Sequence, residues 1–323
     1  MADTSDPAIQ AAIAAVKESF GTILIGFTIA TTLYGITVLQ TYLYFRHYTK
    51  DALWMRVMVA SLWALDTFTT ILVAHSLYTY TVLNFLNLAA DEAIPWSFAL
   101  ESEMVDIITL IAQCFFGYQL LLVSKYKIIP IAVFLLAIAA FALDIKVTAE
   151  LFKTLSVAAL GTRQIYVVGS VVQGLCFLCD VIITGGLVYH FRGAESKQKS
   201  TGVMVDNLIL YTVTRGTATA ICQLMFMALN VSRPNDTFWQ PFHQAVGKLY
   251  VNSVLATLNF RATATKGSAI PLGRVRENTT SRRGLNDAEM ASPSHSQPKP
   301  LNGSQHVITT DIKTILHRNC TQE

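Results

Sequence analysis

The sequence predicts an all-α, polytopic membrane protein with seven transmembrane helices, its N-terminus outside and its C-terminus in the cytoplasm. Three observations predict this fold class. First, 52% of the 323 residues are hydrophobic and only 14% are charged, whereas about a quarter of the residues of a soluble domain are charged. Second, apolar segments of about 20 residues, long enough to cross a bilayer, recur along the chain. Third, Lys and Arg gather in alternate connections between these segments.

The apolar segments give seven predicted spans. In chain order they cover residues 20–45, 54–77, 102–123, 128–147, 164–190, 205–229 and 241–260. The second and the last are the least hydrophobic, so we expect them to face neighbouring helices rather than lipid. The stretch before the first span is slightly acidic and lacks a cleavage site, so we expect that span to be a retained anchor. The predicted organisation is an extracytoplasmic segment over 1–19, a seven-helix domain over 20–260 and a cytoplasmic tail over 261–323.

The orientation follows from the basic residues beside the spans. Connections after the odd-numbered spans, together with the start of the tail, hold 12 Lys and Arg residues, and the opposite flanks hold five. Basic residues favour the cytoplasmic side, which places the N-terminus outside. We therefore expect a multi-pass protein of the plasma membrane or of an endomembrane. The sequons at Asn230 and Asn235 then lie on the outer side, and the sequence does not decide whether either is glycosylated.

The tail has a composition unlike that of the rest of the chain. From about residue 261 onward it is rich in Ser, Thr, Asn, Pro and basic residues, which cannot bury enough apolar surface to fold alone. We expect a disordered tail. Thr279, Thr280 and Ser281 lie between arginines and resemble a kinase substrate patch. Residues 306–318 can form a short amphipathic helix for the membrane or for a cytoplasmic partner.

Composition and motifs argue against several function classes. The net charge of +3 is too small to indicate nucleic-acid binding. Cys176 and Cys179 share a helix face, but no second pair or nearby His completes a metal site, so we expect core thiols. No hydrolase or metalloprotease motif occurs, and histidines such as His243 lie near helix ends, where interfacial solvation accounts for them. We expect no enzyme, no catalytic residue, no metal and no cofactor.

Three segments carry a resemblance to a known family. These are "DNLILYTVTRGTATAICQL" in the sixth span, "GKLYVNSVLATLNFR" in the seventh and "PWSF" ahead of the third. They resemble a fungal family of seven-helix integral membrane proteins, the domain-of-unknown-function family DUF6534, over roughly residues 20–262. The resemblance implies a seven-helix architecture and a fungal origin, and it assigns no ligand, activity or catalytic residue. The family's usual Asn-Arg-Gly reads Thr-Arg-Gly here, at Thr214 to Gly216.

Ionisable residues inside the predicted spans are the candidate functional residues, because an unpaired charge near the bilayer centre is costly. At about 1.5 Å per residue, Asp66, Asp180 and Arg215 come out roughly 15–18 Å from the cytoplasmic end of their helices, in one layer near the midplane. Asp106 and Lys248 come out about 6–11 Å from the outer end, in a shallower layer.

Helical spacing gives these residues a common direction. Side chains of one face recur at steps of three or four on the fifth, sixth and seventh spans, and all but Leu255 are polar or cysteine: Gln173, Cys176, Asp180 and Thr184; Tyr211, Arg215, Thr219 and Cys222; Gln244, Lys248, Asn252, Leu255 and Asn259. Each stripe should face the bundle interior. We hypothesise that Arg215 pairs with Asp180, Asp66 or both, and that a proton or small cation fills the remaining charge deficit.

Two interpretations of this polar layer stay open. Asp66, Asp180, Arg215, Asp106, Lys248 and Asn252 either form a site for a small-molecule ligand, an ion or a proton, or are structural pairs that fix helix register. The first interpretation favours a receptor or sensor, although the Asp-Arg-Tyr and Asn-Pro-x-x-Tyr motifs of G-protein-coupled receptors are absent. A transporter or proton pathway is the alternative. Retinal is not expected, because Gln244 stands where microbial opsins place an Asp one turn before the Schiff-base lysine, here Lys248.

Overall fold

The computed structural model describes residues 7–84, 93–195, 202–233 and 236–267. The chain divides into two units, Met1–Arg261 and Ala262–Glu323. Of the second unit, the structure describes only the end of one helix. The predicted disordered tail, its Thr279–Ser281 patch, the amphipathic segment 306–318 and the sequon at Asn235 all lie outside the described residues.

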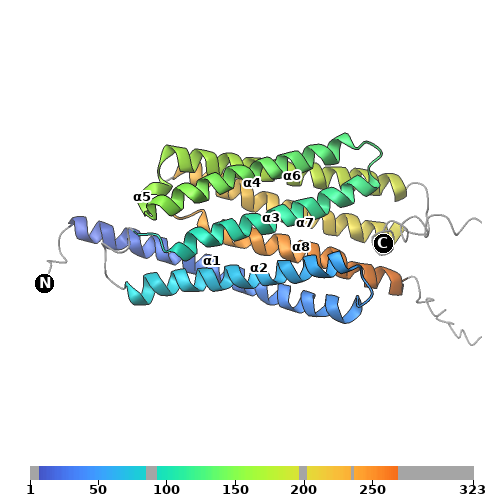
Figure 1. Ribbon diagram of the computed structural model, residues 1–323, viewed down its shortest axis with the longest axis horizontal. Helices are drawn as coiled ribbons and strands as arrows, with labels where there is room; N and C mark the ends of the chain where they lie inside the picture. The colour runs from blue at the N-terminus through green and yellow to red at the C-terminus, as the bar shows by residue number, and fades with distance from the viewer. Residues whose placement is uncertain (1–6, 85–92, 196–201, 234–235, 268–323) are drawn as a thin grey trace, which may run out of the picture. The chain divides into compact units, whose positions relative to one another are not determined.

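The described residues are α-helical almost throughout (Figure 1). The long helices are α1 (Pro7–His47), α2 (Leu53–Tyr78), α3 (Trp96–Val123), α4 (Ile128–Thr154), α6 (Arg163–Glu195), α7 (Gly202–Ser232) and α8 (Gln240–Gly267). A π-helical turn, η1 (Thr79–Leu83), continues α2, and a single-turn helix, α5 (Val157–Leu160), follows α4. The all-α fold class predicted from the sequence is therefore confirmed.

Five of these helices are long and apolar enough to cross a membrane: Phe20–His47, Leu53–Leu83, Trp96–Val123, Ile128–Thr154 and Arg163–Arg192. The protein is therefore a polytopic membrane protein. Within the described part of the chain, α7 and α8 are not among these five spans, so the predicted count of seven is matched only in part. In α8, Gln240, His243, Gln244 and Lys248 lower the hydropathy, and these polar residues are buried inside the protein.

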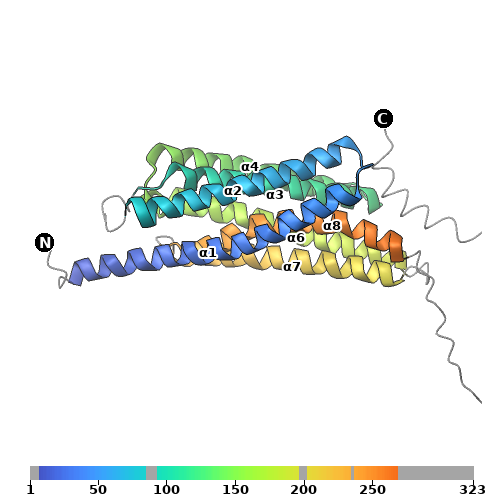
Figure 2. The ribbon, with the colours of Figure 1, turned by 90° about the horizontal axis from the view of Figure 1, so that it is seen from below.

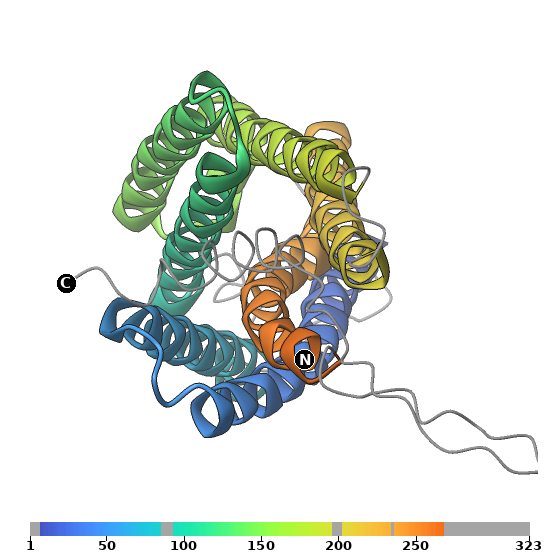
Figure 3. The ribbon, with the colours of Figure 1, turned by 90° about the vertical axis from the view of Figure 1, so that its right-hand side faces the viewer.

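The helices of the first unit run side by side (Figure 2). Packing follows chain order, with contacts between α1 and α2, α2 and α3, α3 and α4, α4 and α6, and α6 and α7. Seen from one end of the helices, α8 lies beside α1 on the inner side of this arrangement (Figure 3). Large apolar side chains such as Ile25 on α1 and Ile138 on α4 are exposed on the outside, as expected where lipid is the solvent.

The main core is built from α3 and α8 together with facing residues of α1, α2, α4 and α6. Ile108 and Leu120 of α3 and Val251 and Leu255 of α8 are fully buried in it. A second apolar cluster closes the end of the bundle where α3 and α8 begin, and it holds Ile94, Phe98, Leu151, Phe226 and Trp239. These two clusters leave the polar residues of α8 between apolar layers.

Helix α3 begins earlier than predicted. It starts at Trp96 rather than at residue 102, directly after Pro95, because proline lacks an N–H group that a helix start does not need. The incoming chain is held there by a hydrogen bond of 2.8 Å from the N–H of Ile94 to the carbonyl of Leu155, which follows α4 with a positive φ of 43°. The earlier start brings Glu101 into the helix.

Candidate functional site

Helix α8 contacts most of the other long helices through its polar side chains. Asn252 donates to the carbonyl of Leu33 in α1 at 3.0 Å, and Asn259 donates to that of Gln40 in α1 at 2.9 Å. Lys248 reaches α2, and Tyr250 bonds to residues of α3, α6 and α7. The predicted inward face of the last helix is therefore confirmed, and α8 is the element around which the polar residues are organised.

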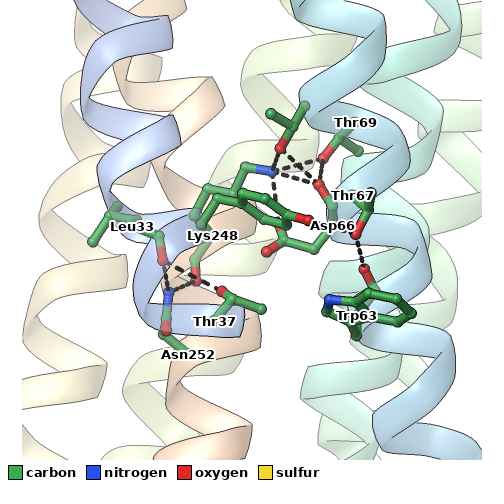
Figure 4. A network of polar contacts seen from close by, with 10 residues as sticks. Leu33, Thr37, Trp63, Asp66, Thr67, Thr69, Lys248 and Asn252 are labelled. Atoms are coloured by element: carbon green, nitrogen blue, oxygen red, sulfur yellow. Dashed lines mark hydrogen bonds and ion pairs between the residues drawn. The ribbon is translucent and has the colours of Figure 1, made fainter. Parts of the chain in front are cut away.

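Lys248 is the most completely bonded of these residues (Figure 4). Its ammonium nitrogen lies 2.7 Å from the Oδ1 atom of Asp66 in α2. The same nitrogen donates three hydrogen bonds, to the Asp66 carbonyl at 2.7 Å, Thr69 Oγ1 at 2.9 Å and Thr70 Oγ1 at 2.6 Å. Three donors are all that an ammonium group has. The lysine charge is thus fully compensated by one turn of α2.

This pairing corrects the sequence hypothesis. Asp66 was expected to share a layer with Arg215, but it pairs with Lys248. Among the described residues, no ion pair within 4.0 Å joins Arg215 to a carboxylate. The depth of a residue along its helix was estimated from the sequence, whereas its partner also depends on the direction in which the helix faces. Asp66 and Lys248 therefore form one site, and Arg215 belongs to another.

Tyr250 is the centre of the second polar site, which we call the central layer and define as Gln113, Asp180, Arg215, Gln223 and Tyr250. The Tyr250 hydroxyl donates to Asp180 Oδ2 at 2.9 Å and accepts a hydrogen bond of 2.6 Å from Gln223 Nε2. Gln113 Nε2 approaches the same hydroxyl at 3.4 Å. One phenol thereby links α8 to α6, α7 and α3.

Arg215 is held in the central layer mainly by an aromatic ring. Its guanidinium carbon lies 3.5 Å from the centre of the Phe116 ring, and its Nη2 atom makes one long hydrogen bond of 3.5 Å to Thr184 Oγ1. The side chain is buried, and its Nε and Nη1 atoms have no hydrogen-bond partner. Asp180 lies close enough to interact with it electrostatically. Arg215 is therefore a buried cation with unused donors.

The glycine after Arg215 sets the distance between α6 and α7. A Cβ atom on Gly216 would collide with the side chain of Thr184 in α6. Thr214 is exposed on α7. In the Thr-Arg-Gly motif, Arg215 and Gly216 therefore face the bundle, and Thr214 faces away from it.

A third group of titratable side chains lies nearer the end where α3 and α8 begin. His243 Nε2 lies 3.5 Å from Glu101 Oε2, and both residues are almost fully buried. The prediction that interfacial solvation accounts for His243 is wrong, because Phe226 and Trp239 pack against its ring. A sequence signal existed, since Gln240, Gln244 and Lys248 recur at steps of four beside it.

Asp106 faces another acid. Its carboxyl group lies close enough to that of Asp144 in α4 to interact with it electrostatically, and both side chains are buried. Two adjacent buried carboxyls cannot both be ionised without a large cost. Asp144 was not singled out from the sequence, because it lies alone in an apolar run. Asp106 and Lys248, which were expected to share a layer, thus have different partners, Asp144 and Asp66.

A small cavity is lined by Lys248 of the first ion pair and by Glu101 of the third group. Its volume is about 10 Å³, and Thr70, Glu101, Gln244 and Lys248 contribute polar groups to its wall. This is about the space that one water molecule needs. Both amide atoms of Gln244 are buried without a hydrogen-bond partner from the protein.

Cys176 and Cys179 are free and buried, as expected for core thiols. Across the part of the chain that the structure describes, no group of three or more His, Cys, Asp and Glu side chains is arranged to hold a metal ion.

Comparison with known proteins gives one match. Residues 176–263 match a family of unknown function, DUF6534. No curated protein and no solved structure matches the chain. The matched segment is shorter than the resemblance over residues 20–262 expected from the sequence. It contains four of the five residues of the central layer, namely Asp180, Arg215, Gln223 and Tyr250. Over this segment, from the second half of α6 to most of α8, the chain is similar to the DUF6534 family.

Proposed function

We propose that this protein is a seven-helix receptor-like or sensor protein in which the central layer binds a small polar ligand. The observation that carries the proposal is Arg215, a buried guanidinium whose Nε and Nη1 atoms lack hydrogen-bond partners. A buried charge with unused donors is costly for a purely structural residue. A ligand that supplies acceptor oxygens would remove that cost.

The proposal includes α7 and α8 as the sixth and seventh spans. With 31 and 28 residues, they are about 46 and 42 Å long, more than the ~30 Å hydrocarbon core requires. Arg215, Thr219 and Gln223 of α7 and Gln244 and Lys248 of α8 are buried inside the protein, which is compatible with a lipid surround. Seven spans put the two termini on opposite sides of the membrane. The distribution of Lys and Arg supports an N-terminus outside and a tail in the cytoplasm, where a cytoplasmic partner would reach it.

The ligand chemistry follows from the two charges of the layer. Arg215 would bind a carboxylate, phosphate or carbonyl oxygen, and the carboxylate of Asp180 stands beside it. A ligand that engages either group would change the hydrogen bond between Asp180 and Tyr250. The Tyr250 hydroxyl also joins α7 and α3 to α8, through Gln223 and Gln113. Binding would thereby shift the packing of four helices, as a sensor requires. No catalysis, metal or cofactor forms part of the proposal.

Native mass spectrometry of the purified full chain tests this function. We expect a co-purifying solute on the wild-type protein that is lost in Arg215→Lys and in Asp180→Asn. Thr214→Ala is the matched control, because Thr214 is the exposed neighbour of Arg215. A solute retained equally by all four proteins would contradict the proposal, as would a wild-type protein that carries none and is not stabilised by any acceptor-bearing solute in a thermal-shift screen.

A proton or ion pathway is the second candidate, and a specific observation favours it. The acidic pair Asp106–Asp144 and the pair Glu101–His243 are buried near the end where α3 and α8 begin, and Asp180 lies beyond them in α6. Titratable groups at successive depths are typical of proton relays. Proton flux into proteoliposomes that disappears in Asp106→Asn would favour this candidate over a receptor.

A structural role is the third candidate, and it fits the Lys248–Asp66 pair best. All donors of Lys248 are used within α2, which leaves none for a ligand. Such a pair fixes the register of α8 against α2. We therefore assign Lys248, Asp66 and Asn252 to the framework of the bundle and the central layer to binding.

A further inference from the structure

A groove lies at the opposite end of the helices from the Glu101–His243 pair. It runs between the start of α4 and the last turns of α6, with Leu120 of α3 at its base, and its volume is about 580 Å³. Volumes of this size are typical of ligand sites in proteins. The same end carries the connection from α3 to α4, which the distribution of basic residues assigns to the cytoplasm.

Two glycines of α6 create the groove. A Cβ atom on Gly185 would meet no other atom within 4 Å, so the space beside this residue is open. A Cβ atom on Gly186 would lie 2.8 Å from Leu120 Cδ1, so this glycine lets α6 approach α3. The groove therefore has open space beside Gly185, where α6 carries no side chain.

The groove is polar at one end and apolar along its length. Lys125, Tyr126, Tyr189 and His190 stand at the polar end. The wall toward the membrane interior is formed by Ile129, Val181 and Ile182. Val181 precedes Arg192, near the end of α6, by 11 positions, or about 16 Å along a helix. The apolar part of the groove thus extends well into the depth of the bilayer.

The polar end is basic. Lys125 is exposed, and among the described residues no carboxylate lies within 4.0 Å of Lys125 or His190. Tyr126 and Tyr189 are 65% and 76% exposed, and tyrosine prefers the level of the lipid headgroups. A ligand of this groove must therefore combine a negative charge at the interface with an apolar portion that points toward the midplane.

We propose that the groove binds a phospholipid with an anionic headgroup. The headgroup phosphate lies at Lys125 and His190, and one acyl chain follows Val181 and Ile182 across Gly185. Basic pockets between helices on the cytoplasmic side are suited to anionic headgroups. The depth of the apolar wall favours a lipid over a soluble anion, because a soluble anion has no apolar portion that could pack against this wall. This site is separate from the central layer, and the proposal does not depend on the function assigned there.

Lipid retention tests the proposal. The full chain is equilibrated with phosphatidylcholine vesicles that contain a minority of phosphatidylserine, extracted into detergent, and examined for bound lipid by native mass spectrometry. We expect phosphatidylserine to be retained in excess of its share. Lys125→Gln should weaken retention about fivefold, since one lysine near the surface contributes about that factor. Gly185→Leu should abolish it by filling the groove.

Two matched controls make the result specific. The first control is Gly35→Leu on α1, away from the groove. As at Gly185, a Cβ atom on Gly35 would meet no atom within 4 Å, so the added side chain also enters open space. Lys50→Gln removes an exposed lysine from the connection after α1, at the same end of the helices. Both should retain lipid as the wild type does. Equal retention of phosphatidylcholine and phosphatidylserine, or undiminished retention in both Gly185→Leu and Lys125→Gln, would overturn the proposal.

Discussion

Lys248 of α8 and Asp66 of α2 form a buried ion pair, with 2.7 Å between Nζ and Oδ1. The side chains are 5% and 0% exposed. Thr69 and Thr70 complete the hydrogen bonds of the ammonium group from the same turn of α2. A membrane-length helix accepts this lysine because the neighbouring helix provides one counter-charge and an acceptor for each donor.

The pair should be more sensitive to the loss of one partner than to the loss of both. Lys248→Met leaves the carboxylate of Asp66 buried without a counter-charge, which costs about 3 kcal/mol or more. We expect Asp66→Asn to be similarly destabilised, and the double variant Asp66→Asn/Lys248→Met to recover most of the loss. Thermal unfolding in detergent measures this. If the double variant loses the sum of the two single losses, the residues are not coupled.

The close packing of α6 and α7 at Gly216 should be sensitive to a single methyl group. Gly216→Ala places a Cβ against Thr184, and overpacking of this kind costs about 1–3 kcal/mol. Thr184→Ala removes two of the three conflicting atoms, so the double variant should be more stable than Gly216→Ala alone. Gly35→Ala, at an open position, should leave the unfolding temperature unchanged. A Gly216→Ala protein as stable as the wild type would show that the helices are not in this contact.

The hydroxyl of Tyr250 should matter more than its ring. Tyr250→Phe leaves Asp180 Oδ2 and Gln223 Nε2 without their partner, and an unsatisfied buried polar group costs about 1–3 kcal/mol. Unfolding in detergent should show this loss. The control is Tyr189→Phe, because Tyr189 is 76% exposed and should lose nothing. Equal stability of the two variants would argue against the hydrogen-bonded layer.

Asn230 should carry no glycan even though it begins a sequon. Its side chain is buried, and Nδ2, the atom that a glycan would occupy, donates to the Tyr166 carbonyl at 3.1 Å and to Ser170 Oγ at 3.0 Å. Glycopeptide mapping after expression in a eukaryotic host should therefore find residue 230 unmodified. A glycan at Asn230 would mean that the end of α7 unwinds or that α6 and α7 separate there.

The fold class could be predicted from the sequence because it depends on composition and on the length of apolar runs. Both can be read from the sequence without knowing which residues are in contact. The start of α3 could not be read in the same way, since Glu101, Ser102 and Glu103 are polar and interrupt the apolar run shortly after the helix has begun. The single turn of α5 is too short for any periodic pattern to show.

The candidate site was predicted in its residues but not in its pairs. Helical spacing correctly turned Asp180, Arg215 and Lys248 inward, because the side chains on one face follow from geometry alone. The partner of each charge depends on how neighbouring helices are rotated about their axes, which no single sequence contains. For this reason Asp66 was placed with Arg215 instead of Lys248. The burial of His243 was not predicted, because a residue near a helix end was expected to contact water. Instead, Phe226 and Trp239 cover this end of α8.

The central claim is that Arg215 is retained for binding rather than for stability. The double variant Asp180→Asn/Arg215→Met removes both charges of the central layer while it preserves their approximate volume. Native mass spectrometry and thermal unfolding of this variant, measured together against the wild type, provide the most direct test. The account predicts that the co-purifying solute is lost while the unfolding temperature stays equal to, or rises above, that of solute-free wild type, because an incompletely bonded buried charge has been removed. A lower unfolding temperature with the solute still bound would contradict it.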